Sequence, residues 1–424
     1  MKRLVVAAAI AFASVQSTAH AQTVVLKAAR LIDGRGGRPL EPAMIRVDGN
    51  TIAEVGSKIA VPAGATVIDL GTATLLPGLI DLHTHLTDRA DVHWEDALTT
   101  TTPPEAALWG ARNARVTLMA GFTTVRDMGP TWPYVDVELR KAIEAGAVPG
   151  PRMTAAGNYV SSTGGAGDAR QFSMYVDVPI VRNLADGPEE IVKAVRTNFK
   201  YGADFIKILV TGAVLSKGIP PGAQQYSDEE IRAAVVEAKR WGRPVAAHAH
   251  GAAGIKAAIR AGVRTVDHGS SLDDEAVALL KNNHDTYYVP TLALGSYVQQ
   301  NPKVPESEKA RGRANDEIAV AGFRRALAAG LPIGLATDAP VMPHGLNGKE
   351  LVYRVSLGQP AMDVIVSATS INAQILGKSD QIGSVEPGKL ADIIAVPGNP
   401  LADMTVVERV GFVMKGGTVY KNEK

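Results

Sequence analysis

Short apolar runs alternate with longer amphipathic segments through the middle of the chain. The segments between the runs carry helix signals, such as Thr102 before Pro103, and Ser227 in a capping box with Glu230. Eight runs occur, at 79–85, 123–128, 152–157, 204–210, 244–250, 265–271, 287–293 and 333–338. Eight β-α units over about 300 residues are typical of a (β/α)8 barrel with insertions. The pattern therefore predicts an α/β protein built on a TIM barrel.

A doubly wound, open parallel sheet is the alternative fold for the same alternation. Such a fold needs a Gly-rich phosphate turn after its first strand. The first run here ends in His83-Thr84-His85 instead, so we prefer the barrel.

Both ends of the chain show the period-two pattern of β strands. Asp48-Gly49-Asn50 lies between two alternating apolar runs, which is a hairpin signal, and "GFVMKGGTVY" near the C-terminus has a similar character. Neither end is long enough to form a sheet domain with a core of its own. We therefore expect one small β-sandwich domain made of 22–76 and 377–424, attached to a barrel made of 77–376.

The first 21 residues have the composition of a secretory signal peptide. Lys2 and Arg3 precede an apolar stretch at 4–15, and Ala19-His20-Ala21 is a small-x-small cleavage site. The sequence thus predicts a mature chain that starts after residue 21 and is periplasmic or secreted. No later stretch is apolar for long enough to span a bilayer, so no membrane association is expected.

Charge and cysteine content narrow the classes of partner and of chemistry. The formal net charge is +1, which provides no basic field for nucleic acid. The chain has no cysteine, so it has neither disulfides nor thiolate ligands. Any bound metal must then be held by histidine, carboxylate or a less usual ligand.

Titratable side chains interrupt the apolar runs near their C-terminal ends, where barrel enzymes assemble their sites. A single one of them would be an ordinary buried or capping residue, but convergence from five runs favours a metal centre. His93 and His284 lie outside the runs and are expected at the surface. The converging residues are His83, His85, Lys207, His248, His250, His268 and Asp338.

Lys207 is the most informative of these residues, because it stands inside the apolar run "FIKILV". An ammonium beside divalent cations would be repelled, which favours the neutral amine over its ordinary pKa of about 10.4. A lysine in this position is therefore expected to take part in metal binding as something other than a cation.

Several motifs together resemble the amidohydrolase superfamily. They are "TLLPGLIDLHTHL", the lysine of the fourth run, "AAHAHG", "DHG", "ATDAP" and "GSVEPGKLADIIAV". Within the superfamily the chain is similar to the imidazolonepropionase-like branch, which includes bacterial Xaa-Pro and Xaa-basic dipeptidases and ochratoxin-hydrolysing amidohydrolases. "TGAVLS" and "QQYSDEE" strengthen that likeness, which covers nearly the whole mature chain.

The resemblance implies two divalent metal ions per chain, usually Zn²⁺. His83, His85 and Asp338 would hold one ion, and His248 and His268 the other. Lys207, carboxylated on its amine to a carbamate, would bridge the two ions together with a hydroxide. The resemblance also implies a homo-oligomer, commonly an octamer.

The same resemblance suggests roles for the remaining residues. Asp338 would act as base and then as acid, and His250 would hydrogen-bond the developing oxyanion. Besides His250, the candidates for substrate binding are Tyr226, in the loop after the fourth run, and His344, after the eighth. A loop tyrosine that only packs its ring is the alternative for Tyr226.

The expected activity is hydrolysis of an amide bond in a small N-acyl amino acid or dipeptide that carries a free carboxylate. Ochratoxin A, with release of phenylalanine, is the first specific expectation, and Xaa-Pro or Xaa-basic dipeptides are alternatives. A mononuclear deaminase or cyclic-amide hydrolase is a second class, but such enzymes generally lack the lysine. A non-catalytic barrel is the third, although such proteins typically lose ligands and none is missing here.

Overall fold

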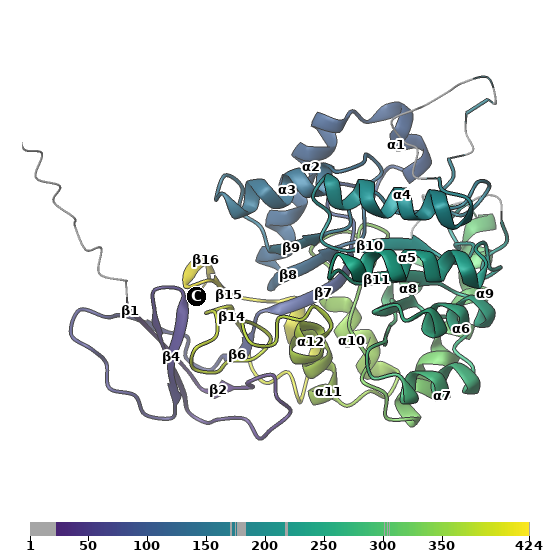
Figure 1. The fold of residues 1–424 in the computed structure, drawn as a ribbon. Coiled ribbons are helices and arrows are strands. Elements are labelled where there is room, and N and C mark those ends of the chain that lie inside the picture. Colours follow the sequence, from purple (N-terminus) through teal and green to yellow (C-terminus); the bar gives the residue numbers. More distant parts are fainter. Residues whose placement is uncertain are drawn as a thin grey trace, which may run out of the picture.

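The structure is a computed structural model that describes residues 23–169, 172–173, 175, 184–216, 219–300, 302, 304 and 306–423. The signal peptide predicted at 1–21 lies outside the described residues, so its cleavage stays a prediction. The described part of the chain forms an α/β fold in which short strands alternate with helices (Figure 1).

Seven parallel strands follow the first seven predicted runs. They form a three-stranded sheet, β7-β8-β9, and a four-stranded sheet, β10-β11-β12-β13. The strands are β7 (Leu79–Thr84), β8 (Phe122–Asp127), β9 (Arg152–Ala155), β10 (Ile206–Leu209), β11 (Val245–Ala249), β12 (Thr265–His268) and β13 (Tyr287–Val289).

Single parallel bridges link these two sheets into a ring of pairings. Val160 bridges to Ile208, which joins the chain just after β9 to β10. The eighth predicted run forms no regular strand; it makes one bridge from Ile333 to Tyr288, and the residue just after it, Ala339, bridges to Thr84. The prediction of a full eighth strand is therefore wrong, because only two isolated bridges form where this segment passes between β13 and β7.

Twelve α-helices are described, most of them in the connections between the parallel strands. They are α1 (Trp94–Thr100), α2 (Pro103–Met119), α3 (Val135–Glu144), α4 (Gly187–Lys200), α5 (Asp228–Arg240), α6 (Ala252–Ala261), α7 (Asp274–Asn282), α8 (Ala293–Gln300), α9 (Glu306–Ala328), α10 (Gly348–Ser356), α11 (Ala361–Val366) and α12 (Asn372–Ile375). A π-helical turn (Ser367–Ile371) joins α11 to α12, and a 3-10 helix covers Met404–Glu408. No described helix has both the length and the apolar character required to cross a lipid bilayer.

The helix starts read from the sequence are confirmed at α2 and α5. The Thr102 hydroxyl accepts a hydrogen bond from the Glu105 N–H, and Ser227 and Glu230 form a reciprocal capping box. Gly262 ends α6 with a φ of 86°, which a residue with a Cβ rarely adopts. These local signals fix where each helix begins or ends, and so where the neighbouring strand can start.

Buried apolar side chains fasten the helices to the outer face of the parallel strands. Ile206 of β10 and Val245 of β11 share one cluster with Val195, Ile231 and Ile255 from α4, α5 and α6. All five side chains are almost fully buried. Removing apolar surface of this extent from water holds the strands in place, so that their C-terminal ends converge on one side.

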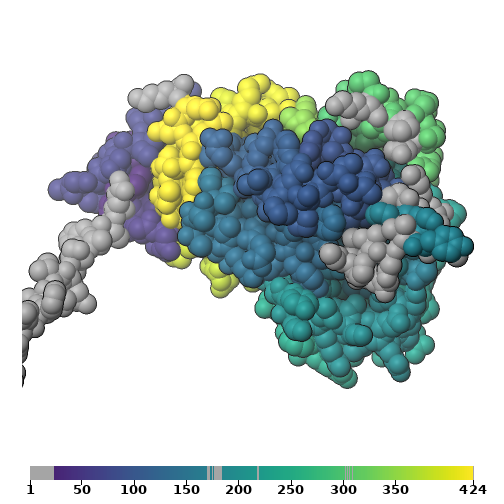
Figure 2. Space-filling view, turned by 90° about the horizontal axis from the view of Figure 1, so that it is seen from above, coloured from purple at the N-terminus to yellow at the C-terminus, as the bar shows by residue number. Residues whose placement is uncertain are grey.

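The two ends of the chain form two further sheets, which lie together at one end of the molecule (Figures 1 and 2). One has the order β4-β3-β1-β5, and the other β16-β15-β14-β6-β2. The hairpin predicted at Asp48-Gly49-Asn50 is confirmed as the antiparallel β3–β4 pair. The strands are β1 (Thr23–Ala28), β2 (Arg30–Leu31), β3 (Ala43–Asp48), β4 (Thr51–Gly56), β5 (Thr66–Asp69), β6 (Thr74–Pro77), β14 (Ile393–Val396), β15 (Phe412–Lys415) and β16 (Thr418–Asn422).

Side chains from both terminal sheets are buried in one hydrophobic cluster. Leu26 and Ile45 enter it from the first sheet, and Leu75, Ile393 and Phe412 from the second. Each of these five side chains has no measurable exposure. The N-terminal and C-terminal segments are therefore held together by shared apolar contacts.

Candidate metal centre and its pocket

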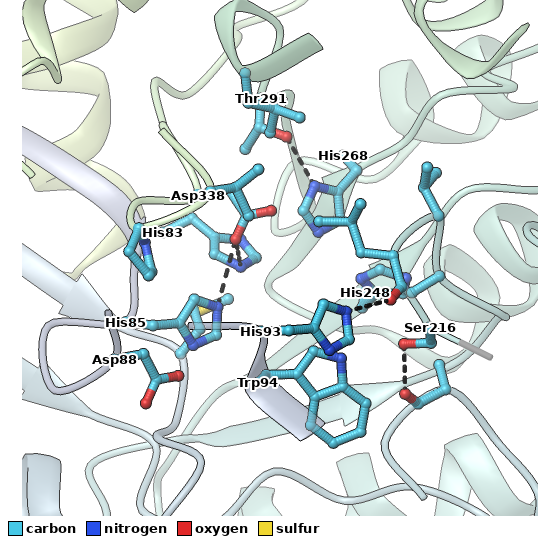
Figure 3. Close-up of a pocket in the computed structure, with 18 of the residues that line it drawn as sticks. His83, His85, Asp88, His93, Trp94, Ser216, His248, His268, Thr291 and Asp338 are labelled. Atoms are coloured by element: carbon cyan, nitrogen blue, oxygen red, sulfur yellow. Dashed lines mark hydrogen bonds and ion pairs between the residues drawn. The ribbon is translucent and has the colours of Figure 1, made fainter. Parts of the chain in front are cut away.

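The structure brings the six predicted metal ligands and the predicted oxyanion donor His250 to one cavity. The cavity has a volume of about 620 Å³ and lies beyond the C-terminal ends of the parallel strands. The histidines and Asp338 face one another across its floor (Figure 3). The seven residues, His83, His85, Lys207, His248, His250, His268 and Asp338, come from β7, β10, β11, β12 and the segments that follow.

His83, His85 and Asp338 form one group whose ligand atoms lie within 4.8 Å of one another. The Asp338 Oδ1 is 3.3 Å from the His83 Nε2 and 3.4 Å from the His85 Nε2. The Nδ1 of His85 lies 2.6 Å from the Gly129 carbonyl oxygen, to which it donates. Burial lowers the pKa of His85, but the hydrogen bond and charge of Asp338 outweigh it and raise this pKa to about 9.

His248, His250 and His268 form a second group, also with ligand atoms within 4.8 Å of one another. Burial, followed by the charge of the neighbouring histidines, lowers the pKa of His248 and His268 well below the ordinary value. The His248 Nε2 is buried and has no hydrogen-bond partner among the described residues. These rings are therefore neutral and offer lone pairs, as metal binding requires.

Hydroxyl groups orient two of these imidazoles. The His250 Nδ1 is 2.8 Å from the Ser270 Oγ. The His268 Nδ1 is 2.8 Å from the Thr291 Oγ1, a contact that Figure 3 marks with a dashed line. Each ring thus keeps its Nε2 for the cavity, which is the usual arrangement around a metal-binding histidine. The donor set, the neutral rings and the buried Nε2 without a partner all fit divalent cations.

Two of the candidate ligands have strained backbone conformations: His268, the last residue of β12, and Asp338, the last residue of the eighth predicted run. His268 has a φ of 65° and Asp338 a φ of 59°, in the left-handed region that favours glycine. Such conformations cost about 1–3 kcal/mol each and persist only where the surroundings enforce them. The fold therefore holds both side chains in positions that a relaxed backbone would not give.

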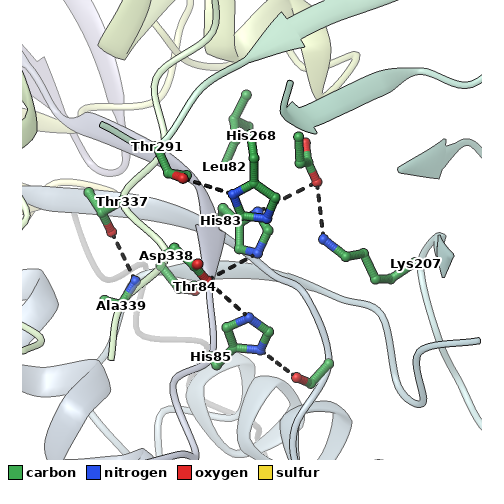
Figure 4. Close-up of polar contacts among 12 residues, drawn as sticks. Leu82, His83, Thr84, His85, Lys207, His268, Thr291, Thr337, Asp338 and Ala339 are labelled. Atoms are coloured by element: carbon green, nitrogen blue, oxygen red, sulfur yellow. Dashed lines mark hydrogen bonds and ion pairs between the residues drawn. The ribbon is translucent and has the colours of Figure 1, made fainter. Parts of the chain in front are cut away.

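Asp267 links His83 of the first group to Lys207, and the sequence reasoning missed it. Its Oδ2 lies 3.4 Å from the Lys207 Nζ and 3.5 Å from the His83 Nδ1 (Figure 4). Its Oδ1 accepts a hydrogen bond from Arg126 at 3.0 Å. Burial disfavours the charged carboxylate, but Arg126 and Lys207 outweigh it and hold the pKa of Asp267 well below its ordinary value.

Arg126 and Asp267 could have been found by the rule that identified Lys207. Each is a charged residue within a buried strand, Arg126 in β8 and Asp267 directly before His268 in β12. Arg126 also donates to the Leu82 carbonyl oxygen at 2.7 Å. A charge buried in a strand needs a partner of opposite charge, and Arg126 and Asp267 are each other's partner.

Lys207 is fully buried, and its amine reaches the same Asp267 oxygen as His83 (Figure 4). Burial lowers the pKa of the Lys207 amine, although the charges of Asp267 and Asp338 oppose the shift. A lowered pKa increases the fraction of neutral amine, which is the form that reacts with CO2.

The two residues predicted to bind substrate do not reach the cavity. Tyr226 is only 2% exposed, and its hydroxyl donates to the Ala185 carbonyl oxygen at 2.9 Å within the core around α4 and α5. His344 lies behind His85, with its Nε2 3.2 Å from the His85 carbonyl oxygen. Both assignments are corrected: each side chain makes an internal hydrogen bond, and neither lines the cavity.

Of the two histidines expected at the surface, only His284 is exposed. His93 caps the N-terminus of α1 and lines the cavity instead. Its Nε2 lies 3.3 Å from the Leu215 carbonyl oxygen, so it links α1 to the loop after β10 (Figure 3). Apolar residues also line the cavity wall; they include Val92, Trp94, Val214, Leu215, Leu294 and Val298.

Residues 74–420 match the model of the amidohydrolase family. The chain belongs to this family, whose members are generally metal-dependent hydrolases, and the histidine-rich centre agrees with that membership. The match covers the whole set of parallel strands and all of the candidate ligands.

Individual relatives are similar to this chain over nearly its whole length. Ochratoxinase from Aspergillus niger is 32% identical over 435 residues, which cover 96% of this chain and 88% of that protein. Its crystal structure superimposes with a TM-score of 0.83 at 30% identity, over 95% of this chain and 96% of that one. The crystal structure of a Xaa-Pro dipeptidase with methionine in its active site has a TM-score of 0.87 at 38% identity, over 95% of this chain and 100% of that one.

Proposed function

We propose that the protein is a binuclear metal-dependent hydrolase that cleaves the amide bond of small N-acyl amino acids or dipeptides with a free carboxylate. The observation that carries the proposal is the convergence of two three-residue ligand groups on one cavity, with Lys207 and Asp267 next to them. The family membership supports hydrolysis as the reaction class.

His83, His85 and Asp338 would hold one ion, and His248 and His268 the other, with zinc as the proposed metal. Lys207 would bridge them as a carbamate, for which its buried position and lowered pKa provide the neutral amine. When bound, two such ions would polarise a substrate carbonyl and make water nucleophilic near neutral pH.

Asp338 would move the proton in this reaction. Its carboxylate faces the cavity and contacts both histidines of the first group, so it can accept a proton from water and deliver it to the leaving amine. His250, whose Nε2 is kept for the cavity by Ser270, would donate a hydrogen bond to the oxyanion that develops on the substrate.

Ochratoxin A, with release of phenylalanine, is our first specific substrate, because ochratoxinase is similar over nearly the whole chain and the cavity wall is largely apolar. A Xaa-Pro or Xaa-basic dipeptide is the alternative, and similarity to a Xaa-Pro dipeptidase supports the dipeptide class.

Several wider features belong to the same proposal. The ring of parallel pairings is interpreted as a (β/α)8 barrel, and the two terminal sheets as one β-sandwich domain, because of their bridges and their shared cluster. A periplasmic or secreted location and an octameric assembly stay predictions from the sequence.

The direct test is product analysis by mass spectrometry. Zinc-reconstituted protein is incubated with N-acyl amino acids, dipeptides and ochratoxin A, and metal content is measured on the same samples. We expect free amino acids to appear and two metal equivalents per chain. Release of ammonia with one equivalent would favour a mononuclear deaminase, and absence of any product would overturn the proposal.

The role of His250 is tested by His250→Ala. Loss of the oxyanion donor should lower kcat by about 10²- to 10³-fold while two metal equivalents remain. His284→Ala, which changes an exposed histidine, is the matched control. Loss of a metal equivalent from His250→Ala would make His250 a ligand instead, as its place in the second group allows.

A further inference from the structure

One acidic side chain in the cavity wall is not used by the proposed mechanism. Asp316 lies on α9, and with Gly312 and Asn315 it forms the part of that helix which lines the cavity. Its carboxylate has no hydrogen bond or ion pair with any residue in the described part of the chain. A half-buried carboxylate without a partner costs free energy, so it calls for an explanation.

The adjacent helix α8 leaves room for this carboxylate. Gly295 lies in α8, and any side chain there would collide with the carboxylate of Asp316. A glycine inside a helix costs about 1 kcal/mol relative to alanine. The carboxylate of Asp316 on α9 thus packs against the backbone of α8 at Gly295. This contact holds the charge at the cavity wall without neutralising it.

The other acids around the cavity mostly have partners. Asp88 accepts a hydrogen bond from the Thr131 N–H at 3.1 Å, and Asp91 pairs with Arg89 at 2.8 Å. For Asp316, burial is the one cause of the pKa shift, and it raises the pKa of the carboxyl to about 6. No positively charged side chain within the described residues offsets the free-energy cost of that burial. The carboxylate can therefore bind a cation from outside the protein.

We propose that Asp316 is a specificity-determining residue that binds a positively charged group of the substrate, either an ammonium or a guanidinium. This inference rests on the proposed amide hydrolysis and sharpens its substrate class. A dipeptide offers such a group at its N-terminus, and a Xaa-basic dipeptide also offers one on its side chain. An N-acyl amino acid such as ochratoxin A offers neither, so this inference supports the dipeptide alternative of the proposed function over ochratoxin A.

The test compares substrates that differ only in the cation. Leucyl-phenylalanine against isocaproyl-phenylalanine isolates the N-terminal ammonium, and leucyl-lysine against leucyl-norleucine isolates the side chain. For Asp316→Asn, kcat/KM should fall about tenfold or more for the cationic member of one pair and stay within about twofold for its neutral partner. Glu317→Gln, at an exposed neighbouring position on α9, should change neither.

The pair that responds identifies the source of the cation. An equal change in both members of each pair, or no change in any, would overturn the proposal. Binding of the same four compounds to metal-loaded protein, measured by titration calorimetry, separates the two hypotheses. If no amide is cleaved but the cationic members still bind more weakly to Asp316→Asn than to wild type, hydrolysis fails and cation binding stands; equal affinities would reject cation binding.

Discussion

The two ligand groups on the floor of the cavity differ in charge. His83, His85 and Asp338 include a carboxylate, and its contacts raise the pKa of His85 to about 9. The second group consists of three imidazoles, which burial keeps neutral at His248 and His268. The first group can therefore hold a cation with its own negative charge, whereas the second cannot.

This difference explains why Lys207 lies beside the second group in the proposed centre. A divalent cation held only by neutral rings in a buried site would lack an anion nearby, which is unfavourable. A carbamate on Lys207 would provide one, while the unmodified ammonium would worsen the imbalance. The predictions below test this asymmetry, from the largest expected effect to the smallest.

Asp338→Asn should have the largest effect, because it removes both the anion of the first group and the proton carrier. We expect kcat to fall by about 10²- to 10⁴-fold. Steady-state kinetics, with metal analysis on the same samples, measure this effect. Asp380→Asn, at an exposed acid, is the control; near-normal turnover in Asp338→Asn would remove the basis of the proposed mechanism.

Lys207→Met should empty the second group while the first keeps its ion, since only the second lacks a carboxylate of its own. We expect metal content to fall from two equivalents towards one, with a loss in metal affinity at least as large as the 10- to 100-fold typical of an outer partner. Lys207→Glu restores an anion and should retain more metal than Lys207→Met. Equal metal content in the two variants would show that charge at this position does not matter.

Asp267→Asn should weaken metal binding, because Asp267 contacts His83 of the first group and the proposed bridging residue Lys207 through one oxygen. We expect about 10- to 100-fold lower metal affinity, measured by competition with a chelator. The variant also leaves Arg126 buried with its charge uncompensated, so its Tm should fall. Adding Arg126→Met should recover part of the Tm but none of the affinity; recovery of both would make Asp267 a purely structural residue.

The smallest effect concerns the stability of the metal-free protein. The folded-state pKa of His85 is raised from 6.5 to about 9, so its contribution is fully present below pH 6.5 and is lost as pH rises through 9. The difference in unfolding free energy between wild type and His85→Gln should shrink across that window, by at most about 3 kcal/mol. Denaturant titrations at several pH values measure it, and the same trend in an Asp338→Asn background would contradict the assignment.

Much of the site was predictable because a titratable side chain is unusual within a buried strand. A titratable side chain inside an apolar run has to be explained, and five histidines, Lys207 and Asp338 near the ends of such runs indicated one centre. Arg126 and Asp267 are also charged residues within buried strands. They were missed because the prediction considered candidate metal ligands near the ends of the runs rather than every buried charge. Tyr226 was misassigned because loop position says nothing about the direction of a side chain.

The sequence alone determined the order of the first seven parallel strands, the helix caps at α2 and α5, and the six metal-ligand candidates that gather with His250 at the cavity. These features depend on local periodicity and on hydrogen bonds between near neighbours, both of which can be read along the chain. The tertiary structure alone decided that Asp267 contacts both His83 and Lys207, that His344 lies behind His85, and that Asp316 has no partner among the described residues. Those facts depend on contacts between segments far apart in sequence, and packing fixes such contacts only after the whole chain has folded.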